Sequence, residues 1–260
     1  MGYDVMIWEE LSSLQLAKAG KSLPVMVNIS ATEQHGNHLP LGTDRIIGDY
    51  FCRKLNDRIA DKVLLLPNLS IGYSRHHLGF PGTLSLSHST LIAQLEEIVD
   101  SVFAHKFTKF ILFNSHGGNQ ALGQVFIEKM GDKYPHGHFF MMNWFRLAVE
   151  ELRKLSESGP GGIGHGGEFE TSLMLRIAPH LVDENNISSM RNIPTFSWAE
   201  GDLLQGAEVS YYRSMSSMTK NGIYGDPRFA TADKGAKIEK VVVTRMTEIV
   251  NDIFNISASE

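Results

Sequence analysis

Residues 24–44 read PVMVNISATEQHGNHLPLGTD, an apolar run that passes into a polar loop. The run is short and rich in β-branched residues, which predicts a buried strand. In the loop, Glu33 and His35 are two residues apart, so in extended chain both side chains point to the same side. Asp44 follows at the expected start of a helix. Carboxylates and an imidazole that converge in this way are ligands for zinc, manganese or iron(II).

The same residues also admit a simpler interpretation. Glu33 would then be a solvated loop residue, and Asp44 would only cap the helix that follows it. A Glu-x-His pair is common by chance, so this segment alone does not decide between the two. The decision depends on which other residues the fold brings to the same place.

Composition describes an ordinary soluble protein, with 42% hydrophobic and 20% charged residues, and we expect one domain over residues 1–260. The net charge of −5 and the lack of a basic run give no reason to expect nucleic acid as a partner. No apolar stretch approaches the roughly 20 residues of a membrane helix, and no signal peptide is evident. The single cysteine, Cys52, excludes an internal disulfide and favours a cytoplasmic location.

Apolar periodicity predicts strands that alternate with helices along most of the chain. The expected strands are 24–29, 63–67, 110–113 and 138–143, and the expected helices are 11–19, 44–60, 89–103, 119–130, 145–155, 168–177 and 233–254. Residues 181–228 are expected to be irregular, with short pieces only. This alternation indicates an α/β fold with a mainly parallel sheet covered on both faces.

Polar segments follow each predicted strand. Glu33 and His35 follow the first, a glycine-rich loop with His77 follows the second, His116 follows the third and Trp144 follows the fourth. Ligands of such sheets bind beyond the carboxyl ends of the strands, so the four segments should meet at one edge. For His116 the alternative is an exposed histidine in a glycine-rich turn. The shared edge favours the metal interpretation.

A further candidate segment is HGGEFET, residues 165–171. If a helix begins near Glu168, one helix face cannot easily send both Glu168 and Glu170 to one metal. We favour Glu168 for the site, with Glu170 as the second choice in a supporting or capping role. The set then contains three carboxylates and two imidazoles, which suits two ions that share a bridging carboxylate. Its members are Glu33, His35, Asp44, His116 and Glu168.

Two such ions would generate a hydroxide at neutral pH and polarise a carbonyl group. The chemistry that follows is hydrolysis of an amide or similar bond in a small molecule, without a covalent intermediate. The sequence contains no Gly-x-Ser-x-Gly elbow and no phosphate-binding loop that would indicate another reaction.

Four motifs together resemble the creatininase (creatinine amidohydrolase) family. They are EQHG at 33–36 with Asp44, FPGT at 80–83, NSHGGN at 114–119 and HGGEFET at 165–171. The resemblance implies a three-layer α/β/α sandwich, two divalent ions (zinc or manganese, with iron also open), cleavage of a carbon–nitrogen bond, and a homo-hexamer. It matches Glu33, His35, Asp44 and His116 to metal ligands, with Asp44 bridging, and it matches His165 and Trp144 to substrate contacts.

The chain departs from true creatininase in two places. Creatininase resembles His-x-Glu where this chain has His116-Gly117-Gly118, and it has a tryptophan at the position of Gly161. The chain therefore resembles a His-Gly-Gly-Asn subgroup, in which Glu168 replaces the missing glutamate as a ligand and catalytic group. Creatinine is not the expected substrate.

Related members cleave formamides, process peptides or open carbocyclic rings, and a non-catalytic metal- or ligand-binding protein is the alternative. We expect His77 and His165 to contact the substrate. His165 would either protonate the leaving nitrogen or only hold Glu168 or the substrate in position.

Overall fold

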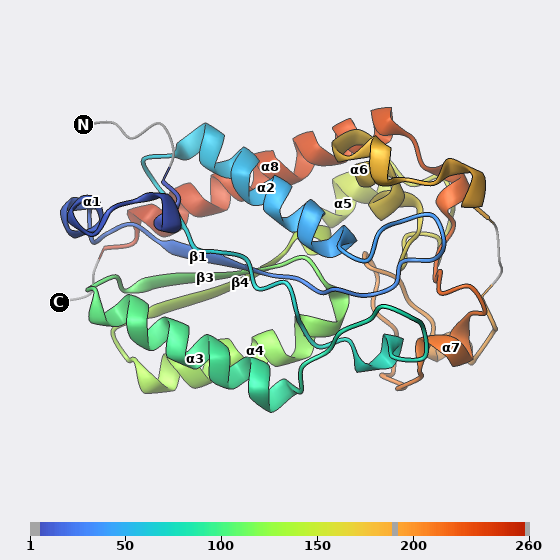
Figure 1. The fold of residues 1–260 in the computed structure, drawn as a ribbon, viewed down its shortest axis with the longest axis horizontal. Helices are drawn as coiled ribbons and strands as arrows, with labels where there is room; N and C mark the ends of the chain where they lie inside the picture. The colour runs from blue at the N-terminus through green and yellow to red at the C-terminus, as the bar shows by residue number, and fades with distance from the viewer. Residues whose placement is uncertain (1–5, 189–191, 258–260) are drawn as a thin grey trace.

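A computed structural model describes residues 6–188 and 192–257. Its centre is a four-stranded parallel sheet in the order β2-β1-β3-β4 (Figure 1). The strands are β1 (Val25–Ile29), β2 (Leu64–Leu65), β3 (Lys109–Asn114) and β4 (His138–Asn143). All four predicted strands are present, and β2 is the one much shorter than expected.

Helices cover both faces of the sheet. In Figure 1, α2, α5, α6 and α8 lie above it, and α3 and α4 lie below it. The helices are α1 (Ser13–Lys18), α2 (Thr43–Ile59), α3 (His88–Ala104), α4 (Gln120–Lys133), α5 (Val149–Arg153), α6 (Glu168–Ile177), α7 (Met215–Met218) and α8 (Ala232–Asn255). The predicted three-layer α/β/α architecture is confirmed.

Alternate residues of the inner strands feed two separate cores. On β3, Ile111 and Phe113 join the core beneath α2, α6 and α8, whereas Phe110 and Leu112 join the core against α3 and α4. Side chains of a strand alternate between its faces, so a sheet buried on both sides needs an unbroken apolar run. Such a run is what the sequence shows here.

The longest helix, α8, runs across the upper layer (Figure 1). The Thr231 hydroxyl caps its start by accepting a hydrogen bond from the Lys234 amide at 3.1 Å. Near its other end, the buried Lys109 of β3 donates from Nζ to the Phe254 carbonyl at 2.8 Å. The helix is thus fixed both near the carboxyl edge of the sheet and near the start of β3.

The remaining segments differ little from expectation. The predicted helix over 145–155 divides into a 3₁₀ turn, Trp144–Arg146, and the short α5. Residues 181–228 contain only α7 and isolated 3₁₀ turns within the described part, which omits 189–191. Residues 1–5, where a leader would begin, also lie outside the described part. No described helix is long and apolar enough to cross a membrane.

Candidate metal centre

The loop after β1 delivers Glu33 and His35 beyond the carboxyl edge of the sheet, and the first turn of α2 delivers Asp44. The His35 ring lies with Nδ1 3.1 Å from the Glu33 carbonyl oxygen and Nε2 3.1 Å from Asp44 Oδ1. A carbonyl can only accept, so Nδ1 carries the proton and Nε2 faces the carboxylates. This orientation is common for metal-binding histidines.

His116, just after β3, has the same arrangement with its nitrogens exchanged. Its Nε2 donates to the Tyr73 carbonyl at 2.9 Å. Its Nδ1 then lies 3.2 Å from Glu33 Oε1 and 3.1 Å from Asp44 Oδ2. Each of the two imidazoles thus has one ring nitrogen bound to a backbone carbonyl and turns the other toward the same pair of carboxylates.

Two carboxylate oxygens at this point are buried without a hydrogen-bond donor among the described residues: Glu33 Oε1 and Asp44 Oδ2. The Glu33 side chain is 0% exposed, and its other oxygen accepts from the Ser74 hydroxyl. Burial of an unpaired anionic oxygen is costly, so a cation is the expected partner. The donor set of carboxylate oxygens and imidazole nitrogens fits divalent zinc or manganese.

The titration of these groups shows how strongly they interact. Burial alone would raise the pKa of Glu33, but the charge of His116 and the hydrogen bond from its ring hold it well below its usual value. Burial would lower the pKa of His35, but Asp44 raises it to about 9. The pKa of His116 is likewise raised well above its usual value, because Glu33 and Asp44 outweigh burial. Without a metal ion, protons on the imidazoles therefore lie between these groups, where a cation would otherwise bind.

Glu170, not Glu168, reaches this centre. Helix α6 begins at Glu168, and in its first turn the side chains of Glu168 and Glu170 point in different directions. The Glu170 carboxylate lies 3.8 Å from His35 Nε2 and accepts a hydrogen bond from the Gly166 amide at 2.6 Å. Burial raises the pKa of Glu170 to about 7. The preference for Glu168 in the sequence analysis is contradicted, and the second choice takes its place.

Glu168 is instead a buried anchor. Its carboxylate pairs with Lys234 of α8 and accepts from the amides of Glu157 and Ser158 at 3.0 Å. Burial would raise the pKa of Glu168, but Lys234 and the Ser158 hydroxyl lower it. These bonds fix the chain just before the glycine-rich turn that leads to His165. Glu168 thus lies outside the metal centre and supports it by fixing the chain segment that leads to His165.

Trp144 is also misplaced by the sequence analysis. Its side chain is 0% exposed and packs beside Phe51 and Phe145 in the core under α2, with ring centroids 5.8 and 5.5 Å away. A ring without exposed surface presents no face to a substrate. The 3₁₀ turn after β4 directs it inward, which the sequence pattern did not reveal.

His77 and His165 both reach the centre. His165 Nδ1 lies 3.3 Å from Glu33 Oε1, and its Nε2 donates to the Gln34 carbonyl at 2.5 Å. His77 Nε2 lies 3.7 Å from the same Glu33 oxygen, and its Nδ1 accepts a hydrogen bond from the side-chain amide (Nε2) of Gln34 at 2.6 Å. Burial lowers the pKa of His77 to about 3 and that of His165 well below its usual value, so both rings are neutral.

Four sets of side chains each place one ligand atom per residue within 4.8 Å of the others. They are Glu33/His35/Asp44, His35/His165/Glu170, Glu33/His77/His165 and Glu33/His76/His116. His76 is absent from the sequence-based list of site residues. The signal that would have found it is the His-His pair in a loop at the same sheet edge.

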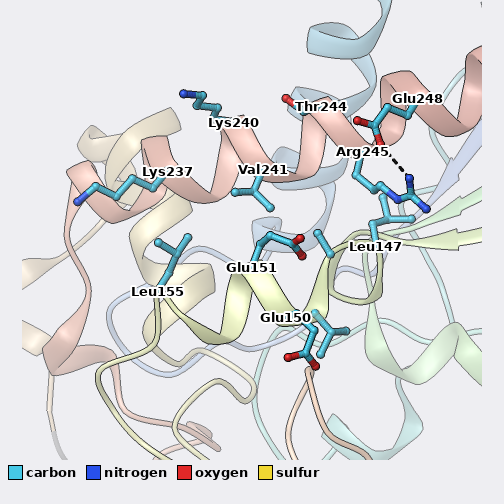
Figure 2. A pocket seen from close by; sticks show the side chains of 12 residues that line it. Leu147, Glu150, Glu151, Leu155, Lys237, Lys240, Val241, Thr244, Arg245 and Glu248 are labelled. Carbon is cyan, nitrogen blue, oxygen red and sulfur yellow. Dashed lines mark hydrogen bonds and ion pairs between the residues drawn. The ribbon is translucent and has the colours of Figure 1, made fainter.

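Another hollow on the surface is unrelated to this cluster. Figure 2 shows a groove of about 760 Å³ between α5 and α8, lined by Leu155, Val241, Lys237, Glu151 and others. It contains no histidine and lies on the outer side of the helical layer. None of the side chains in the four ligand sets lines this groove.

Comparison with known proteins agrees with the geometry. A sequence profile described as creatinine amidohydrolase matches residues 6–250. The chain belongs to the creatininase family. It is 29% identical to a creatinine amidohydrolase of Pseudomonas putida over 180 residues, covering 63% of this chain and 67% of that one. It is 31% identical to a mycofactocin precursor peptide peptidase of Mycolicibacterium smegmatis over 220 residues, covering 82% and 78%.

Solved structures have the same fold. A crystal structure of creatinine amidohydrolase (creatininase) superposes with a TM-score of 0.81 at 24% identity, over 98% of this chain and 100% of that one. Creatininase structures described as Zn-Zn type and as an Mn form are similar at TM-scores of 0.81. This protein is accordingly a creatininase-family hydrolase with candidate metal-ligand groups.

Proposed function

We propose that this protein hydrolyses a carbon–nitrogen bond of a small linear or cyclic amide with two divalent ions, zinc or manganese. The observation that carries the proposal is the pair of buried, donor-free oxygens, Glu33 Oε1 and Asp44 Oδ2, faced by imidazole nitrogens. Creatininase structures in Zn-Zn and Mn forms support it.

The side chains divide into two groups about Asp44. Its Oδ2 lies beside His116 and its Oδ1 beside His35, at 3.1 Å in both cases. Asp44 would therefore bridge, with Glu33 and His116 on one side and His35 and Glu170 on the other. When bound, the ions supply a nucleophilic hydroxide and polarise the scissile carbonyl.

We assign the proton transfer to His165. Its Nε2–H is held by the Gln34 carbonyl, which leaves the Nδ1 lone pair facing Glu33. Because its pKa is lowered, Nδ1 is free to accept a proton and then deliver it to the leaving nitrogen. His165 would thus act first as a base and then as the proton donor, which is one of the two roles that the sequence analysis left open.

Peptides are a second candidate class of substrate. The chain is 31% identical to a mycofactocin precursor peptide peptidase over 82% of its length. Formamides and ring ketones remain alternatives. Trp144 offers no stacking face here, which removes one reason to expect a flat ring such as creatinine.

The test combines metal analysis with a substrate screen. Protein purified without chelator should contain close to two transition ions per chain and should hydrolyse at least one lactam, N-formyl compound or short peptide. Asp44→Asn should lose both ions and at least about 100-fold in rate, because an outer partner of a metal ligand alone costs 10–100-fold. Two bound ions without turnover of any substrate would favour a binding protein.

Assembly and location belong to the same proposal. The family resemblance implies a homo-hexamer, and the single cysteine favours the cytoplasm. Sedimentation velocity of the purified chain measures the mass of the assembly directly. A monomer at micromolar concentration would contradict the hexamer without affecting the metal centre.

A further inference from the structure

The Gln34 side chain joins separate segments of the chain beside the centre. Its Oε1 accepts a hydrogen bond from the Gly36 amide at 2.9 Å, and its Nε2 donates to the Gly222 carbonyl at 3.0 Å. A backbone amide can only donate and a carbonyl can only accept, so these two bonds fix which end of the Gln34 amide is oxygen and which is nitrogen. Gln34 therefore offers a donor, and not an acceptor, to the next group along.

That group is His77, whose Nδ1 lies 2.6 Å from Gln34 Nε2 and must accept a hydrogen bond there. A neutral imidazole that accepts at Nδ1 carries its proton on Nε2. His77 Nε2 lies 3.7 Å from Glu33 Oε1, beyond hydrogen-bond distance, and bonds to no other described residue. His77 thus holds an unused N–H group at the centre.

Gly222 keeps Gln34 in this orientation. Its backbone has a φ of +85°, and a Cβ atom at this position would overlap Gln34 Oε1. Two residues later, the Tyr224 amide donates to the His165 carbonyl at 2.8 Å. Residues 222–224 therefore fix both the side chain that orients His77 and the turn that carries His165.

His77 and His165 face the same point with opposite hydrogen-bonding character. Their ring centroids are 4.2 Å apart, and both rings approach Glu33 Oε1. His165 Nε2 also lies 3.2 Å from Gln34 Nε2, but its proton is used by the Gln34 carbonyl, so its Nδ1 lone pair faces the centre. The His165 side chain is 13% exposed and that of His77 only 1%, so the donor lies deeper than the acceptor.

We propose that His77 donates a hydrogen bond from Nε2–H to the carbonyl oxygen of the scissile amide, and that Gln34, held by Gly222, fixes the tautomer that allows it. The inference rests on the proposed amide hydrolysis and deepens it by assigning the two histidines to the two polar atoms of one amide. His77 holds the oxygen, deeper in the site, and His165 serves the leaving nitrogen nearer the opening.

The donor acts on the reaction through the charge of that oxygen. The oxygen becomes more negative as the carbonyl carbon becomes tetrahedral, so a donor fixed in advance binds the transition state more strongly than the ground state. A nitrogen that carries a proton also has no lone pair for an ion. His77 Nε2 is therefore not a metal ligand, although it lies within reach of Glu33 and His165 in one of the four sets.

The first measurement is the tautomer of His77, read by nitrogen NMR of histidine-labelled, full-length protein without metal and with zinc. The parent should carry the proton on Nε2. Gln34→Glu replaces the donor by an acceptor and should move the proton to Nδ1, and Gly222→Ala should displace Gln34 and mix the two tautomers. The matched control is Gly159→Ala, because Gly159 has a similar φ of +74° but its Cβ would meet nothing within 4 Å.

The second measurement is metal affinity, by titration of zinc into metal-free protein with a competing chelator. His77→Ala and His77→Gln should bind both ions within about threefold of the parent, whereas disturbing even the outer partner of a ligand costs about 10- to 100-fold. Thermal unfolding of the metal-free proteins shows whether each variant folds.

The third measurement is turnover of the substrate found in the screen. His77→Ala should lower kcat by about 100- to 1,000-fold, the cost of removing one oxyanion donor, with KM within about threefold. His77→Gln places an amide donor near the position of Nε2 and should recover about tenfold or more of that loss. A residue that only supports the fold would not be rescued in this way.

Opposite results separate the levels of the argument. A parent with the His77 proton on Nδ1, or a folded His77→Ala variant that loses an ion, would overturn the donor assignment. An unchanged kcat in His77→Ala would overturn the contact with the carbonyl oxygen. A parent that turns over no substrate would overturn the proposed function and that contact together, whereas the NMR and metal measurements would still decide whether His77 is a donor or a ligand.

Discussion

Glu168 and Glu170 are buried carboxylates two residues apart on the first turn of α6, yet their surroundings differ in kind. Glu168 has a lysine, two hydroxyls and two amides as donors, and its pKa is lowered. Glu170 has one amide, and its pKa is raised to about 7. A buried carboxylate with a full set of hydrogen-bond donors stabilises the fold, whereas a buried carboxylate with too few donors indicates a site for a cation.

Removing the saturated carboxylate should have the largest effect on stability. Glu168→Ala leaves Lys234 buried with only the exposed Glu157 and the Phe229 carbonyl as partners. Breaking a buried ion pair from one side costs about 3–5 kcal/mol, so urea unfolding of the metal-free protein should show a loss of that size. A loss below about 1 kcal/mol would mean that Glu168 is not the anchor described here.

Removing the undersupplied carboxylate should affect metal binding instead. Glu170→Gln keeps an acceptor for the Gly166 amide and removes a buried charge, so the metal-free protein should be at least as stable as the parent. Affinity for one ion should fall by about 10- to 100-fold in a chelator competition assay. If Glu170→Gln destabilises the metal-free protein as much as Glu168→Ala, the contrast between the two residues fails.

Low pH should remove the contribution of Glu168 to the free energy of unfolding. Its folded-state pKa is lowered from 4.5, so its stabilisation is present above pH 4.5 and is lost as pH falls through the folded-state pKa. The difference in unfolding free energy between the parent and Glu168→Gln should therefore be constant near neutrality and shrink in acid. A difference that grows below pH 4.5 would contradict the lowered pKa.

Replacing both partners of the ion pair should have the smallest effect. In Glu168→Gln/Lys234→Met no buried charge is left unpaired, because the other partner of Lys234, Glu157, is exposed, and such replacements are often close to neutral for stability. We expect a change of less than about 1 kcal/mol relative to the parent, although the Glu157 and Ser158 amides lose a charged acceptor. Stability as low as that of Glu168→Ala would show that the loop contacts, not Lys234, carry the anchor.

Local sequence patterns were sufficient to predict the fold. The continuous apolar runs of β1 and β3 and the helical periodicity of α2 and α8 were enough to predict a parallel sheet in three layers. The same topology correctly brought Glu33, His35, Asp44 and His116 together, because each directly follows a strand or opens a helix at the same edge. Their role as metal ligands stays a prediction.

Details that depend on long-range packing were not accessible. The choice between Glu168 and Glu170 depends on Lys234, 66 residues later, which the sequence does not mark as a partner. The burial of Trp144 depends on a single 3₁₀ turn after β4 and on the space beside Phe51. His76 was overlooked because it belongs to no motif, although it forms an adjacent pair with His77 in a loop at the same edge.

The clamp between α6 and α8 also sets an order of events during synthesis. Lys234 leaves the ribosome after Glu168 by 66 residues, which at 5–20 residues per second is a delay of roughly 3–13 s. Until then the Glu168 carboxylate has no lysine, so the turn that carries His165 is held only by the hydroxyl and amide contacts of Glu168. The newly made chain can form its strands early, but it completes its reactive centre only after its last long helix has docked.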